Sequence, residues 1–264
     1  FNYAGQDTAL VEIKVNDGEP IENEIIYGSI KGLKIDRETQ ETIEGALFGL
    51  FKADETEFTK EKALLTAESK EDGVFTFENV PYGKWLVKEL KPADGFLPND
   101  EIYPAVVGEN AEVIEIEVVN DRIPEISTQA SAEGEKEVSA TEIFTLEDTV
   151  SYKHLIPGKE YVIKGVLMDK STGEPLLIDG EEIRSEIAFI PEEPSGEVIV
   201  PFTFDSKFIK EETNIVVFES LYRDGKELAV HADIEDEGQT VKVKIPEIGT
   251  QASVDGKKEI TSDS

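Results

Sequence analysis

Residues 112–119 read Glu-Val-Ile-Glu-Ile-Glu-Val-Val, and this alternation of apolar and charged side chains decides the fold. Successive side chains of a β-strand point to opposite faces, so the pattern predicts a strand with one buried face. Residues 240–245 alternate in the same way, and turn sequences such as Asp224-Gly225 separate the predicted strands. The sequence therefore predicts an all-β chain. Only the short segments around residues 59–66 and 205–210 are candidates for helix.

The chain contains one internal repeat, which indicates how it is divided. The stretch Ile-Pro-Glu-Ile-Ser-Thr-Gln-Ala-Ser at residues 123–131 recurs, with Gly in place of the first Ser, at residues 245–253. The spacing of 122 residues (245 − 123) is the length of a whole domain. We therefore predict two β-sandwich modules with a flank on either side. The modules are residues 28–122 and 123–244; the flanks are the tail of an upstream module, 1–27, and the start of a further repeat, 245–264.

The composition argues against several classes of function. The 264 residues carry a formal charge of −32, which repels nucleic acid phosphates and anionic membranes, so neither is an expected partner. No apolar run approaches the ~18 residues that a membrane span requires. The chain has no cysteine and only two histidines, so we expect no disulfide, no zinc centre and no other cofactor. A chain without disulfides or a bound metal must gain its stability from other interactions.

Motifs in the first module carry a family resemblance. They are, in order, Lys34-Ile-Asp36, Gly45-Ala-Leu-Phe48, Pro81-Tyr-Gly-Lys84 and Glu89-Leu-Lys-Pro-Ala-Asp-Gly-Phe96. This order resembles the collagen-adhesin B-type (SpaA-like) domain of pilins and adhesins, and it covers nearly the whole module. The resemblance implies an immunoglobulin-like or transthyretin-like β-sandwich.

The same resemblance implies an internal isopeptide bond. Lys34 is the expected amine, Asn120 the carboxamide and Glu89 the assisting acid. Burial lowers the pKa of a lysine and so provides the neutral amine that attacks, while a buried carboxyl tends towards its protonated form and can polarise the amide. Ammonia leaves when the bond forms. The alternative is a surface lysine, a strand-end asparagine and a glutamate in a salt bridge at the rim.

The alternation of side chains between the two faces of a strand (strand parity) tests this assignment independently of the family resemblance. Asn120 shares a face with Ile114, Ile116 and Val118, and Glu89 shares a face with Trp85, so both are predicted to point inward. Parity leaves Lys34 open, because both faces of its strand are apolar.

The second module carries a different set of motifs. They are Asp148-Thr-Val-Ser-Tyr152, Pro157-Gly-Lys-Glu-Tyr161, Val216-Val-Phe-Glu219, His231-Ala-Asp-Ile234 and Asp236-Glu-Gly-Gln-Thr240. Together they resemble the VaFE repeat, which is similar to the threonine–glutamine ester-bond domain of Gram-positive surface adhesins. The sequence departs from the pattern at Val217, where the family name has alanine. This is a packing change without an obvious chemical consequence.

This second resemblance implies an ester bond between Thr128 and Gln239, again with loss of ammonia. A hydroxyl is a weak nucleophile and needs a base, for which His231 is the expected proton acceptor. Asp148 and Glu219 are expected to share a proton and to polarise the Gln239 amide, since close buried carboxyls resist double ionisation. Parity places Thr128 and Gln239 on inward faces. The alternatives are an ordinary strand histidine, a turn-forming aspartate and a surface threonine–glutamine pair.

Three functions compete. The tandem modules favour a non-enzymatic structural stalk of an extracellular adhesin or pilin, anchored to the cell wall through a region outside this sequence. Its partners would be neighbouring modules of the same chain and, at a tip domain, a host or matrix ligand. The alternative is a ligand-binding adhesin module that uses surface loops, although the single tryptophan, Trp85, is expected in the core. A hydrolase is least favoured, because Glu89 and Glu219 lie on strands that are predicted to be buried.

Overall fold

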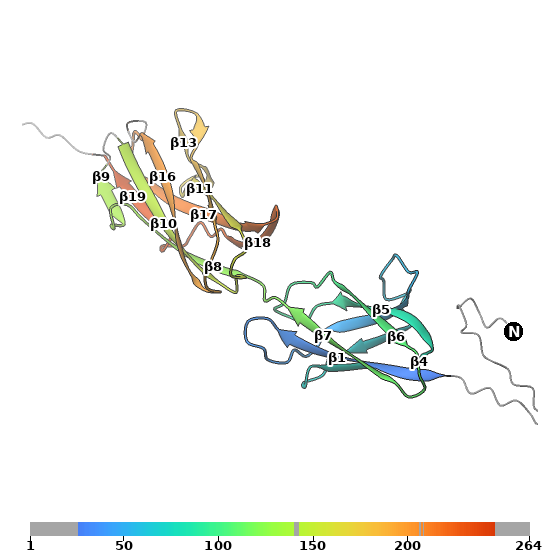
Figure 1. Ribbon diagram of the computed structural model, residues 1–264. Helices are drawn as coiled ribbons and strands as arrows, with labels where there is room; N and C mark the ends of the chain where they lie inside the picture. Colours follow the sequence, from blue (N-terminus) through green and yellow to red (C-terminus); the bar gives the residue numbers. More distant parts are fainter. Residues whose placement is uncertain (1–25, 140–142, 206, 208, 246–264) are drawn as a thin grey trace, which may run out of the picture. The chain divides into compact units, whose positions relative to one another are not determined.

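The computed structural model describes residues 26–139, 143–205, 207 and 209–245, which divide into two units on either side of the Ile123–Pro124 bond (Figure 1). The all-β prediction is confirmed: this part of the chain contains no α-helix. The helix suggested around residues 59–66 is wrong, since residues 60–62 form a turn and a strand begins at Leu65. The segment 205–210 lies partly outside the described residues. None of the described elements is a helix long and apolar enough to cross a membrane.

The first unit is a sandwich of two sheets. One sheet has the strand order β4-β1-β7 and the other the order β3-β2-β5-β6. The strands are β1 (Tyr27–Asp36), β2 (Leu47–Lys52), β3 (Leu65–Glu68), β4 (Val74–Pro81), β5 (Gly83–Lys91), β6 (Ile102–Val107) and β7 (Val113–Asn120).

The first and last strands of this unit, β1 and β7, lie side by side and run parallel. Their register pairs Ser29 with Val113 at one end and Asp36 with Asn120 at the other. The core between the sheets contains Trp85, which is 1% exposed as predicted, together with the aromatic residues of β2 and β4. Because β1 and β7 both face this core, inward side chains near their ends meet in a dry environment.

The second unit is also built from stacked sheets. One has the order β16-β10-β8. The other has the order β12-β11-β17-β19-β9, with β15 also beside β11 and β18 beside β17, and β13 and β14 form a small hairpin. The strands are β8 (Glu125–Ser131), β9 (Glu137–Ser139), β10 (Ile143–Lys153), β11 (Tyr161–Asp169), β12 (Glu174–Pro175), β13 (Leu177–Ile178), β14 (Glu181–Glu182), β15 (Arg184–Phe189), β16 (Gly196–Asp205), β17 (Thr213–Arg223), β18 (Lys226–His231) and β19 (Thr240–Lys244).

A tight hairpin places the histidine of this unit. Strands β17 and β18 are joined by Asp224 and Gly225, whose φ angles of 52° and 75° match the left-handed turn that favours short hairpins. A register shift between Leu221 and Tyr222 then sets His231, rather than Val230, directly opposite Glu219. Because cross-strand partners lie on the same face of a sheet, the two side chains are neighbours.

Candidate cross-linking sites

Three polar side chains meet in the core of the first sandwich. Lys34 on β1, Glu89 on β5 and Asn120 on β7 are 0%, 6% and 2% exposed. The inward orientation predicted for Glu89 and Asn120 is confirmed. The structure also settles the face that parity left open, since Lys34 is buried and its neighbour Leu33 is 37% exposed.

The three groups form one hydrogen-bonded cluster. Lys34 Nζ donates to Asn120 Oδ1 and lies 3.0 Å from Glu89 Oε1. Asn120 Nδ2 donates to the same carboxyl oxygen at 3.0 Å and to the carbonyl of Leu97 at 3.1 Å. One oxygen of Glu89 therefore contacts both the amine and the amide nitrogen, which is where an acid must lie to move a proton between them.

Burial also favours the reactive form of the lysine. The low polarity of the core lowers the pKa of Lys34, and the nearby Glu89 carboxyl opposes part of this effect. Lys34 Nζ also lies 5.5 Å from the centre of the Phe48 ring, which is part of the apolar core. A lysine with a lowered pKa exists more often as the neutral amine, which is the nucleophilic form.

A second buried cluster lies in the other unit. Asp148 on β10, Glu219 on β17 and Gln239, just before β19, are 0–1% exposed, while Thr128 on β8 is half-buried. Gln239 Nε2 donates to Thr128 Oγ1 and lies 3.4 Å from Asp148 Oδ1. The structure thus brings together the predicted nucleophile, its target amide and one of the predicted acids.

The two carboxyl groups of this cluster share a dry environment. Burial raises the pKa of Asp148, and burial together with the neighbouring Asp148 raises the pKa of Glu219 to about 11. Glu219 is therefore protonated at neutral pH. Neither of its oxygens has a hydrogen-bond partner in the described part of the chain, and the same is true of Gln239 Oε1. A protonated Glu219 that donated to Gln239 Oε1 would polarise the amide, and both groups are buried without another partner among the described residues.

A glycine explains why Glu219 is so dry. Gly165 lies opposite Glu219 on the neighbouring strand β11. A side chain at Gly165 would overlap the ring of Phe202, since an added Cβ would lie 2.4 Å from that ring. The absence of a side chain thus lets an aromatic ring from the facing sheet pack beside the acid.

His231 occupies the edge of this cluster rather than its centre. Its ring is 24% exposed, and its Nε2 lies 2.8 Å from Asp236 Oδ2. Within the described residues no hydrogen bond joins His231 to Thr128. Its predicted role as acceptor of the threonine proton therefore remains a prediction.

Comparisons with known proteins assign each unit to a family. A family described as the T-Q ester bond containing domain matches residues 124–243. A family described as the SpaA prealbumin-like fold domain matches residues 28–122. The chain is a SpaA prealbumin-like domain followed by a T-Q ester bond domain. The sandwich class predicted from the motifs is thereby confirmed, because prealbumin is another name for transthyretin.

Solved structures of bacterial surface proteins show more distant similarity. An adhesin from Mobiluncus mulieris, described as containing disulfide, isopeptide and ester cross-links, is 18% identical over 47% of this chain and 58% of its own, with a TM-score of 0.41. BcpA, the major pilin subunit of Bacillus cereus, is 15% identical over 82% of this chain and 67% of its own, with a TM-score of 0.47. No curated protein matches the chain. At these values the family matches alone carry the assignment.

Two residues that complete the sites were missed by sequence reasoning. In the SpaA domain, the backbone N–H of Asn99 donates to Glu89 Oε2 at 2.8 Å, and its side chain donates to the carbonyl of Val119 at 2.9 Å. In the T-Q domain, Asp236 Oδ1 accepts from the N–H of Gly238 at 2.7 Å while its other oxygen contacts His231. Asn99 belongs to no motif, whereas Asp236 lies in a quoted motif three residues before Gln239.

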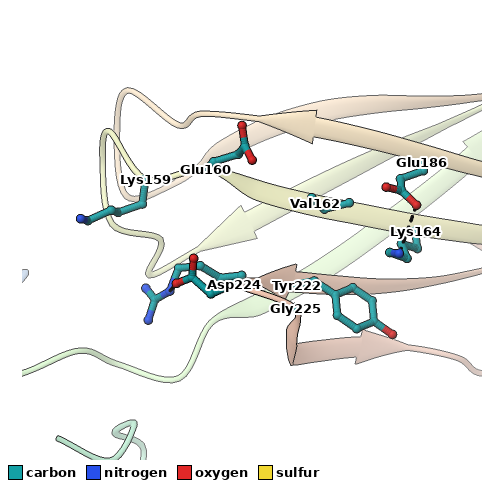
Figure 2. A pocket seen from close by; sticks show the side chains of 9 residues that line it. Lys159, Glu160, Val162, Lys164, Glu186, Tyr222, Asp224 and Gly225 are labelled. Atoms are coloured by element: carbon teal, nitrogen blue, oxygen red, sulfur yellow. Dashed lines mark ion pairs between the residues drawn. The ribbon is translucent and has the colours of Figure 1, made fainter. Parts of the chain in front are cut away.

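A surface groove on the T-Q domain involves neither cluster. It has a volume of about 330 Å³ and is lined by residues of β11, β15 and the β17–β18 hairpin (Figure 2). Two of the three cations that line it have partners, since Lys164 Nζ lies 3.1 Å from Glu186 and Arg223 donates to the Tyr161 hydroxyl at 3.2 Å. Among the described residues no cluster of His, Cys, Asp or Glu could hold a metal ion.

Proposed function

We propose that the chain is a structural stalk segment of a Gram-positive cell-surface adhesin or pilin, stabilised by two bonds that it forms within itself. The bonds are an isopeptide between Lys34 and Asn120 and an ester between Thr128 and Gln239. The proposal is carried by one observation. In each domain a nucleophile on the first strand is in direct contact with an amide at or beside the last strand, with a buried acid beside them.

The isopeptide reaction needs only the cluster in the SpaA domain. The neutral Lys34 Nζ attacks Asn120 Cγ, and the bond from Cγ to Nδ2 breaks. Nδ2 leaves as ammonia, taking up a proton that the lysine nitrogen gives up. Glu89 carries that proton, because its Oε1 contacts both nitrogens at 3.0 Å.

The ester reaction follows the same balance of atoms. Thr128 Oγ1 attacks Gln239 Cδ, the bond from Cδ to Nε2 breaks, and the hydroxyl proton leaves with ammonia. His231 is the proposed proton acceptor, oriented by Asp236. Protonated Glu219 and its partner Asp148 polarise the amide. An ester persists only where water is excluded, and the near-complete burial of Gln239 and both acids supports this requirement.

The two bonds would fix the path of mechanical load. A pull on the chain enters each domain near its first strand and leaves near its last. The proposed links span 86 and 111 residues of chain. Load would cross each link, so the residues between the linked pair need not unfold. Domains linked in this way suit an extracellular stalk that holds a tip domain away from a cell wall.

The reactions proposed here are single events that each chain performs on itself, so the protein is not proposed to be an enzyme. The alternative function, a ligand-binding adhesin module, would use surface loops and grooves. The groove beside Lys164 and Tyr222 is the described candidate for such a role. If the chain is a ligand-binding module, substitution of Tyr222 should abolish ligand binding. If the chain is a structural stalk, the same substitution should have no effect on its function.

Intact-mass measurement of the full chain tests the proposal. The protein should be lighter than its sequence by two ammonia molecules. Lys34→Ala and Thr128→Ala should each restore one, and proteolysis should recover linked peptides containing each residue pair. A mass equal to the plain sequence would exclude both bonds while leaving the sandwich folds intact.

A further inference from the structure

A lysine that neither bond consumes lies against the ester cluster. Lys136 Nζ donates to the carbonyl of Ala130 at 2.5 Å and also to the carbonyl of Gly238. Ala130 is two residues beyond Thr128, and Gly238 directly precedes Gln239. One ammonium group therefore joins the strand that carries the nucleophile to the turn that carries the amide.

The local backbone holds this lysine in place. Residues 132–135 form a tight reversal in which Ala132 and Glu135 exchange two hydrogen bonds of 2.9 Å, with positive φ angles at Glu133 and Gly134. The reversal returns the chain towards β8. The carbonyl of Lys136 then accepts from the N–H of Lys242 on β19 at 2.8 Å, which anchors the lysine backbone to the strand that follows Gln239.

The electrostatic surroundings also point to a role in the site. Asp148 on β10 and the pair Asp236 and Glu237 in the turn before β19 are the carboxyl groups that act on Lys136. Burial lowers the pKa of Lys136, and these acids oppose the effect. His231 and Lys136 both favour the ionised form of Asp148 and so oppose the effect of its burial.

The internal repeat retains this residue. Continued beyond residue 131, the repeat matches Gly134, Lys136 and Glu137 with Gly256, Lys258 and Glu259 at the same spacing of 122 residues (258 − 136). The position between them changes from Glu to Lys. In both copies the lysine comes eight residues after the threonine of the Thr-Gln-Ala-Ser motif (136 − 128 and 258 − 250).

We propose that Lys136 is a positioning residue for ester formation, whose ammonium group holds the Thr128 strand and the Gln239 turn together and places a positive charge near Asp148. This inference rests on the ester bond of the proposed function. Lys136 itself does not react and remains unmodified after the bond has formed. Its loss would loosen the contact between nucleophile and amide and would remove one cation from the acid pair.

The test follows bond formation in time. Full-length chains are synthesised cell-free, quenched at intervals, and digested to measure the fraction in which the Thr128 and Gln239 peptides are linked. Lys136→Met should slow linkage at least about tenfold near neutral pH, the effect of losing a charge-assisted hydrogen bond in the transition state. Lys136→Arg should restore most of the rate, because arginine keeps the charge and the donors.

The pH profile separates positioning from a general structural role. Without Lys136 the pKa of Asp148 should rise, so the acid side of the rate profile should move to higher pH. Lys170→Met is the matched control. Lys170 pairs with Glu237 at 2.8 Å in the same turn, but no hydrogen bond described here joins it to Ala130 or Gly238, so its loss should leave the rate and the profile unchanged.

Each outcome of the test either supports or overturns the inference. Linkage of Lys136→Met at the wild-type rate overturns the inference, and so does a loss that is equal at every pH and is not rescued by arginine. If Lys136→Met does not fold, Lys136→Gln, which keeps a donor without the charge, replaces it. Wild-type chains that never link would instead overturn the ester bond itself, and this inference with it.

Discussion

The proposed ester should give the T-Q domain a measurable excess of stability. Thr128→Val keeps the β-branched shape of the side chain but removes the hydroxyl that would form the bond. Thr128 and Gln239 are 111 residues apart, so the link closes a loop of that length. In the chain-entropy model a loop of this size stabilises the folded state by about 5 kcal/mol, because the linked unfolded chain has fewer conformations to gain.

The direct effect of losing the hydroxyl is much smaller. Thr128 is only half-buried, and a lost neutral hydrogen bond costs about 1 kcal/mol. The total should lower the unfolding midpoint of the T-Q domain by roughly 15–25 °C, given the entropy of unfolding of a domain of this size. A change this large is easy to distinguish from that of an ordinary surface substitution.

Calorimetry of the full chain measures both domains, and the single tryptophan tells them apart. Trp85 is buried in the SpaA domain, so its fluorescence follows that domain alone. Thr128→Val should lower the midpoint temperature of the T-Q domain's calorimetric transition. The midpoint of the SpaA domain, which Trp85 reports, should not change. The SpaA domain thus serves as an internal reference in every sample.

A threonine elsewhere in the same sheet provides the control. The hydroxyls of Thr145 and Thr203 lie 3.0 Å apart at exposed positions on β10 and β16, away from Gln239. Thr203→Val should change the midpoint by a few degrees at most. Equal shifts for the two valine variants, or a wild-type mass that already equals the plain sequence, would refute the reasoning.

Three further predictions concern the buried acids and the histidine. Glu89→Gln should prevent the isopeptide bond, because an amide cannot relay the proton. The intact mass should then show the loss of one ammonia molecule instead of two, and the unfolding transition that Trp85 reports should occur at a lower temperature. In a chain that also carries Thr128→Val, and so cannot form the ester, Glu219→Gln should make the free energy of unfolding of the T-Q domain depend less on pH. The pKa of Glu219 is raised from 4.5 to about 11, so the stability that its proton contributes is complete below pH 4.5 and is lost as the pH rises towards 11. Urea unfolding at about pH 5 and about pH 9 measures this dependence. An equal change in the free energy of unfolding between the two pH values, with and without the Glu219 carboxyl, would contradict the prediction. His231→Gln should slow ester formation in a time course of intact mass, and an unchanged rate would remove the histidine from the mechanism.

Much of the fold and part of each site follow from periodicity alone. The period of two along β5 and β7 assigns Glu89 and Asn120 to the same faces as Trp85 and Ile116, and these faces are the buried ones. The family resemblance then suggested which pairs would react, and the structure places both proposed pairs in contact. Parity works here because each of these strands has one face in the core and one towards water.

Lys34 shows where parity fails. Residues 34–36 at the end of β1 are all buried, because the following segment folds back over the strand: the N–H of Ile43 donates to the carbonyl of Lys34 at 3.0 Å, and Ile35 pairs with Thr42. A strand covered on both faces carries apolar residues on both, so its sequence does not reveal which side chains meet the core between the sheets.

The sequence by itself determined that the chain is all β, that it divides into sandwiches, and which faces of most strands are buried, since these properties depend on neighbours along the chain. Only the tertiary structure decided that Lys34 points into the core, that Asp236 contacts His231, and that Lys136 joins the Thr128 strand to the Gln239 turn. Those contacts join residues from different strands, and local sequence patterns carry no information about which distant strands pack together.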